Sequence, residues 1–307
     1  VMTPKLDVRG IIAGHFDMVT KMSDKYKPGE TVKASYNEIK KVLDLMGIAG
    51  EYPVYMGAGE ALTDEKTPHI TEGAKFIIEE AMREDERPLY IGCQGSITDL
   101  ACAILMEPRI CDKMTAIWIG GGDYPKGGFE FNLIQDVIAA NVVFSSSMPL
   151  WQIPMKVYKT LSVSLAELQY KVKPCGEIGK YLYEKMLEVN KFYEMIPHWP
   201  HGELWGLGDQ GIIAVLMQES ERVDNFHMVP APRVDEKEYF YIEGSGKEGD
   251  EIESDEIKSD EMKSDGIKGG KIKANGNREI RVYDYIDYRL TLEDFFAKLS
   301  INYPRSF

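Results

Sequence analysis

The sequence is poor in cysteine and has no long apolar run, and each shortage excludes a class of protein. The four cysteines form no CxxC pair and lie far apart, at Cys93, Cys102, Cys111 and Cys175. They are too few and too scattered for a disulfide scaffold, and indicate buried free thiols in a reducing, cytoplasmic compartment. No stretch approaches 18 consecutive apolar residues, which excludes an ordinary transmembrane helix and a membrane partner.

Basic residues are also in the minority. The 36 lysines and arginines stand against 50 aspartates and glutamates in 307 residues, for a formal charge of −14. An excess of negative charge disfavours nucleic acid as a partner, because phosphate backbones are bound by clustered basic side chains. With 44% hydrophobic residues the chain can bury a full core, and we expect residues 1–307 to form a single domain.

Much of the acidity is concentrated in a low-complexity segment, residues 244–277. This segment contains three tandem pentads, which begin at Ser254, Ser259 and Ser264. Its composition predicts a solvated loop inserted in a hairpin. It does not have the glycine and acidic spacing of an EF-hand calcium loop.

Short apolar runs alternate with helical patterns along most of the chain, which predicts an α/β fold. We expect a Rossmann-like, mixed but mostly parallel sheet with helices on both faces. The predicted strands are 6–13, 54–56, 89–91, 116–119 and 150–153. The predicted helices are 35–46, 71–83, 99–106, 135–145, two within 164–193 broken at 174–176, 209–217 and 292–299. Residues 238–242 and 279–285 alternate apolar and polar positions, as in an antiparallel hairpin around the acidic segment.

Ligands of such sheets bind beyond the carboxyl ends of the strands, where this sequence places several polar residues. Thr98 and Asp209 can serve a site there or cap the helices that follow them. His15 can serve the same site, or it can be a structural histidine at a strand end whose hydrogen bonds are made within the protein. Glu130 and Asn132 lie two positions apart between phenylalanines, so in an extended segment they share a face suited to vicinal hydroxyls.

Several motifs follow one another along the chain in an order that is typical of one protein family. Residues 130–149 read EFNLIQDVIAANVVFSSSMP. Around them stand a V-x-G-I-I-A strand, P-V-Y-x-G-A, G-x-x-T-D-L-A, a double glycine, a late G-D, and a C-terminal Y-x-x-x-L-T-L-E-D-F-F. In this order the sequence resembles the nucleoside hydrolase family, in particular the inosine-uridine-preferring members and their looser relatives.

The resemblance implies a glycosidase that hydrolyses the N-glycosidic bond of ribonucleosides, or of a related N-ribosyl compound, with a calcium-activated water. It assigns calcium (Ca2+) ligation to the backbone carbonyl of Thr98 and the carboxylate of Asp209. It assigns ribose hydroxyls to Glu130 and Asn132. The remaining residues implied to line the substrate site are His15 and Ile119 at the ribose and Trp205 at the base. A homodimer or homotetramer is expected.

The sequence departs from the family pattern in two informative places. The family opens with an aspartate-rich strand that supplies calcium ligands and the general base, and we expect that segment upstream of Val1. The family histidine before the late aspartate is Gly208 here, which leaves His201 as a candidate acid for the leaving base. The alternative for His201 is a loop histidine without catalytic weight.

Two other functions stay open. One is a non-catalytic nucleoside- or ribose-binding relative that lost the catalytic aspartates. The other is a flavodoxin-like phosphate binder at Gly120–Gly122. It is disfavoured because neither a GxGxxG pattern nor a Walker lysine accompanies these glycines.

Overall fold

The computed structural model describes residues 1–22, 24–193, 201–218, 225–242 and 278–304. The fold is α/β, as predicted, with a mixed central sheet of five strands in the order β3-β4-β5-β11-β8. The first four are parallel and β8 is antiparallel. These strands are β3 (Tyr90–Cys93), β4 (Thr115–Ile119), β5 (Leu150–Ile153), β11 (Glu279–Tyr283) and β8 (Phe226–Pro230). A separate parallel pair joins β1 (Ile11–Ala13) to β2 (Val54–Met56).

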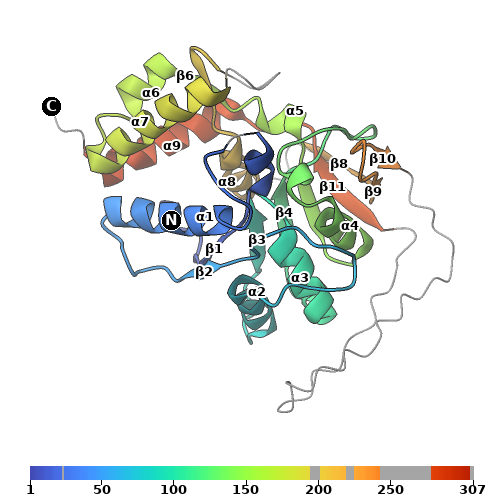
Figure 1. The fold of residues 1–307 in the computed structure, drawn as a ribbon. Helices are drawn as coiled ribbons and strands as arrows, with labels where there is room; N and C mark the ends of the chain where they lie inside the picture. Colours follow the sequence, from blue (N-terminus) through green and yellow to red (C-terminus); the bar gives the residue numbers. More distant parts are fainter. Residues whose placement is uncertain (23, 194–200, 219–224, 243–277, 305–307) are drawn as a thin grey trace.

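Alternation along β4 divides the core into two layers. Ala116 and Trp118 face a cluster that includes residues of α2 (Glu72–Met82), α3 (Thr98–Met106) and α4 (Val137–Ser145). Ile117 and Ile119 face a second cluster with α5 (Met155–Tyr158) and α8 (Gly211–Met217). Because successive strand side chains point to opposite faces, helices must cover the sheet on both sides, as Figure 1 shows.

A third cluster lies beside the sheet. It joins α6 (Leu165–Lys171), α7 (Gly176–Tyr193) and α9 (Tyr288–Asn302), and α1 (Thr31–Leu45) packs against it. The break between α6 and α7 spans residues 172–175, which overlaps the predicted 174–176. Two short antiparallel pairs complete the described elements: β6 (Ser162–Ser164) with β7 (Leu204–Gly206), and β9 (Arg233–Val234) with β10 (Tyr241–Ile242).

Local capping explains several boundaries. Thr71 is the N-cap of α2, and its hydroxyl accepts a hydrogen bond from the Ala74 N–H at 2.9 Å, as the sequence predicts. Asp136 caps α4 in the same way, through the Ala139 N–H. The first strand is shorter than predicted, since only Ile11–Ala13 of residues 6–13 pair with β2.

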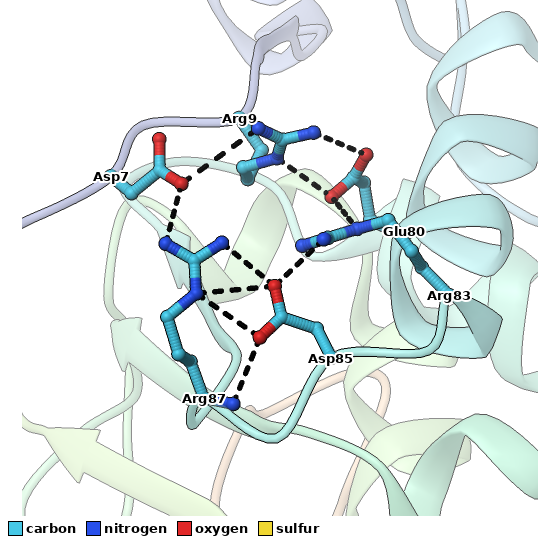
Figure 2. A network of polar contacts seen from close by, with 6 residues as sticks. All are labelled: Asp7, Arg9, Glu80, Arg83, Asp85 and Arg87. Atoms are coloured by element: carbon cyan, nitrogen blue, oxygen red, sulfur yellow. Dashed lines mark hydrogen bonds and ion pairs between the residues drawn. The ribbon is translucent and has the colours of Figure 1, made fainter.

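Residues just before β1 engage in ion pairs instead of strand pairing (Figure 2). Arg9 donates to Glu80 at 3.0 Å, and Arg87 donates to Asp7 at 2.9 Å. Arg87 also pairs with Asp85. The network ties the segment before β1 to the end of α2 and the turn before β3. Because most of these side chains are exposed, each pair contributes little stability.

The predicted hairpin between residues 238–242 and 279–285 is wrong. β11 pairs in parallel with β5 and antiparallel with β8, while β10 pairs with β9. Ile280 and Val282 of β11 are buried, so this strand belongs inside the sheet with both edges paired. Alternating polarity identifies a strand but not its partner, so it does not show that two similar segments nearby in the chain pair with each other. The acidic segment 244–277 lies outside the described residues.

The described part of the chain has no helix that is long and apolar enough to cross a membrane. All four cysteines are free thiols, and three are buried, whereas Cys93 is only partly buried.

The Arg278 guanidinium donates to four backbone carbonyls at the end of α4 and in the turn that follows. These carbonyls belong to Val143, Phe144, Ser146 and Met148.

Candidate functional site

A pocket of about 210 Å³ opens at the carboxyl ends of β3, β4 and β5. This is the edge where ligands of parallel sheets bind. Five of the eight predicted site residues line it, namely Ile119, Glu130, Asn132, Trp205 and Asp209. The other lining residues are Gln94, Phe131, Tyr158, Lys159, Gly206 and Gly208. The chain therefore brings acids, amides, three aromatic side chains and one lysine of the described residues into a single concave site.

Glu130 is fully buried at the back of the pocket, and its carboxylate accepts four hydrogen bonds. Oε1 accepts from the Asn132 N–H at 3.0 Å and the Tyr158 hydroxyl at 2.7 Å. Oε2 accepts from the Gly121 N–H at 2.8 Å and the Leu133 N–H at 2.9 Å. A carboxylate offers about four acceptor sites, so Glu130 has none left over. Direct contact with a ribose hydroxyl stays a prediction, and would require one of these bonds to break.

The segment around Glu130 is not the extended strand that the spacing suggested. Asn132 begins a 3-10 turn at Leu133–Gln135, and it reaches the pocket wall from there. Its amide nitrogen donates to the backbone carbonyl of Ile119 at 2.8 Å. Since a carbonyl only accepts, this contact fixes the orientation of the amide. The Oδ1 atom makes no hydrogen bond to any described residue, and it is available to accept one from a ligand.

Asp209 follows β7 and lies at the start of the turn that leads into α8. Its backbone carbonyl accepts from Gln94 at 3.0 Å, but within the described ranges its carboxylate has no hydrogen-bond partner. Asp209 lines the pocket and is exposed to solvent. Desolvation and the neighbouring charge of Glu130 raise the pKa of Asp209 to about 6. Asp209 is thus the carboxylate of this pocket with open oxygens.

Tyr158 and Gly208 form one wall together. A Cβ atom at position 208 would lie 2.8 Å from the Tyr158 ring, so the ring occupies the space of any side chain there. The Tyr158 hydroxyl is held by Glu130, and the next residue, Lys159, reaches the pocket. Burial lowers the pKa of Lys159, although Glu130 and Asp123 act in the opposite direction. Sequence reasoning did not identify Tyr158 and Lys159, because they follow β5 without any recognisable motif.

His15 and Thr98 lie together, but they do not line the pocket. Thr98 is buried in the first turn of α3, whose N-cap is Ile97, so Thr98 is not the cap. Its hydroxyl donates to Asp136 at 2.8 Å and accepts from Nε2 of His15 at 2.9 Å. Nδ1 of His15 is buried and has no partner among the described residues. Burial lowers the pKa of His15 to about 4, so the ring is neutral.

The predicted general acid and the predicted calcium ligands differ in whether they line the pocket. His201 is exposed and does not line the pocket. Of the two predicted calcium ligands only Asp209 lines it. No group of three histidine, cysteine, aspartate or glutamate side chains that could hold a metal ion occurs in the described ranges.

The sequence profile of the inosine-uridine preferring nucleoside hydrolases matches residues 29–250. The inosine-uridine preferring nucleoside hydrolase of Leishmania major is 27% identical over 149 residues, which cover 47% of this chain and 46% of that protein. The protein of the same name from Crithidia fasciculata is 31% identical over 127 residues, covering 39% and 38%. The matched segments thus span less than half of these relatives.

Solved structures extend the similarity to nearly the whole chain. A purine-preferring ribonucleoside hydrolase from Gardnerella vaginalis superposes with a TM-score of 0.67 over 96% of this chain and 98% of that one. The sequence identity is 18%, so this likeness concerns the fold.

Proposed function

This chain belongs to the inosine-uridine preferring nucleoside hydrolase family, and from that premise we propose that it hydrolyses the N-glycosidic bond of ribonucleosides or of a related N-ribosyl compound. The observation that carries the proposal is the pocket at the carboxyl edge of the sheet. It combines an open carboxylate at Asp209, an oriented amide at Asn132 and an aromatic side chain at Trp205.

The chemistry of the bond explains why these groups suit it. Cleavage of a C–N glycosidic bond leaves positive charge on the sugar, in an oxocarbenium-like transition state. Negative charge on Asp209 and Glu130 would stabilise that state. The open Oδ1 of Asn132 would accept from a ribose hydroxyl, and Trp205 would contact the base. Which base is preferred is not part of the proposal.

The proposal also includes calcium as the metal that activates the attacking water. When bound, Ca2+ would supply Lewis-acid activation of the attacking water. Asp209 offers a carboxylate of the kind that calcium prefers, but the described side chains around it do not complete a coordination shell. The role of Asp209 proposed here is therefore limited to offering one carboxylate to the metal. A cytoplasmic location, supported by the free thiols, and a homo-oligomeric state belong to the same proposal.

The direct test is release of reducing sugar from a panel of purine and pyrimidine ribonucleosides. The chain is expressed with the coding sequence that precedes Val1, and it is assayed with and without a chelator. We expect turnover that the D209N variant abolishes and the D112N variant, at an exposed aspartate, retains. Absence of sugar release from every nucleoside would refute the proposal. Full activity in the presence of chelator would refute only its calcium part.

The alternative is a non-catalytic relative that binds nucleosides or ribose. The observation in its favour is that the described residues hold no group of side chains able to bind a metal. It predicts that ribonucleosides raise the melting temperature without being consumed, because a ligand that binds only the folded state stabilises it.

A further inference from the structure

Hydrolysis of a ribonucleoside requires a proton for the departing base. When the C–N bond breaks, its electron pair stays on the base nitrogen, which is a poor leaving group unless it is protonated as it departs. A donor must therefore reach the base side of the pocket. His201 is exposed and is not among the residues that line the pocket.

The lining side chains leave few donors. The Tyr158 hydroxyl already donates to Glu130 at 2.7 Å, and burial together with the charge of Glu130 raises the pKa of Tyr158. Asp209 is largely ionised at neutral pH and serves better as a source of negative charge. The amides and the indole do not give up protons in this range. Among the described residues that line the pocket, Lys159 is the one cationic side chain.

We propose that Lys159 is the general acid that protonates the leaving base, an inference that rests on the proposed function. As the C1′–N bond breaks, its electrons move to the base nitrogen and a proton passes from Nζ of Lys159 to the base. The sugar cation is captured by water, whose proton goes to the general base. Lys159 is left as a neutral amine and regains its proton from solvent.

The local structure fixes Lys159 for this role. Its neighbour Tyr158 is held at the hydroxyl by Glu130, and its ring fills the space beside Gly208. The backbone at 158–159 is therefore anchored beside the pocket, which Trp205 also lines. Partial burial of Lys159 brings its pKa down toward the working range of a general acid.

The test compares leaving groups that need a proton with one that does not. Inosine and uridine need protonation, whereas 4-nitrophenyl riboside releases a stable phenolate. In K159M we expect kcat for the nucleosides to fall by about 10²- to 10⁴-fold and turnover of the nitrophenyl riboside to stay unchanged. The high-pH decline of the wild-type kcat profile should also disappear. K156M, at an exposed lysine three residues earlier, is the matched control.

Several results would overturn the assignment. An equal loss on all substrates, or no loss on any, would do so, as would the same selective loss in H201Q but not in K159M. Failure of the wild type on every substrate would instead refute the proposed function. In that case the pKa of the Lys159 amine is measured without turnover, by NMR titration of the 13C-methylated amine. The signal of Lys159 is assigned as the one that is missing in K159R. An ordinary pKa of about 10.4 would overturn the proposal.

Discussion

Replacement of Glu130 by glutamine tests how the pocket is held together. In E130Q one carboxylate oxygen becomes an NH2 group, which cannot accept. The less costly orientation places this group toward Asn132 and Tyr158, because the Tyr158 hydroxyl can turn and accept from it. The Asn132 N–H then remains without an acceptor, at about 1–3 kcal/mol. Because burial raises the pKa of Glu130 and favours its neutral form at low pH, little charge assistance is lost there, and we expect a total loss of about 1–3 kcal/mol near pH 5.

The pH dependence of this loss has a definite sign. Burial raises the pKa of Glu130 in the folded state, so the wild type loses stability as pH rises through that pKa. The variant cannot ionise there, and the difference between the two proteins should shrink toward pH 8. Urea unfolding at both pH values measures this through the midpoint at constant m-value, with the exposed E60Q as control. An E130Q protein as stable as the wild type at pH 5 would refute the four-bond arrangement.

Three further substitutions test the fold around the site. R278M should cost about 2–4 kcal/mol, since it leaves carbonyls after α4 without donors, and R278K should recover only part of the loss in a urea titration. G57A should lower the melting temperature far more than G95A, because a Cβ at Gly57 meets the Asp99 carboxylate whereas a Cβ at Gly95 meets open space; equal effects would contradict this close packing. D136A should cost about 2–4 kcal/mol, through loss of a helix cap and of buried partners, and a loss below 1 kcal/mol would argue against the network.

The sequence predicts elements well where a local rule decides them. Thr71 is a recognisable N-cap residue, and the predicted helix 71–83 agrees with α2 to within one residue at each end. Pro174 and Gly176 likewise separate α6 from α7. The partner of β11 could not be found in this way. Its pairing with β5 and β8 depends on which surface the helices leave to be covered, a property of the whole sheet.

The candidate site was predicted in part for a similar reason. Ile119, Glu130, Asn132 and Asp209 follow strands or open a helix, and the family motif order marks them. Lys159 follows a strand too, but the intervening turn of α5 carries no pattern that a sequence reader would associate with chemistry. Its neighbour Tyr158 packs against Gly208, which lies 50 positions further along the chain.

The carboxylates near the strand ends divide into two kinds. Glu130 and Asp136 are buried, and each gathers backbone N–H groups from separate segments, as when Asp136 accepts from Leu62 as well as from its own helix. A carboxylate with its acceptor sites filled orders the loops around a site and is not free to react. By contrast, the carboxylate oxygens of Asp209 and the Oδ1 atom of Asn132 accept no hydrogen bond from any described residue. Neutral replacements should therefore lower stability at Glu130 and Asp136, but should lower turnover with little loss of stability at Asp209, and this contrast separates the scaffold of the pocket from its reactive groups.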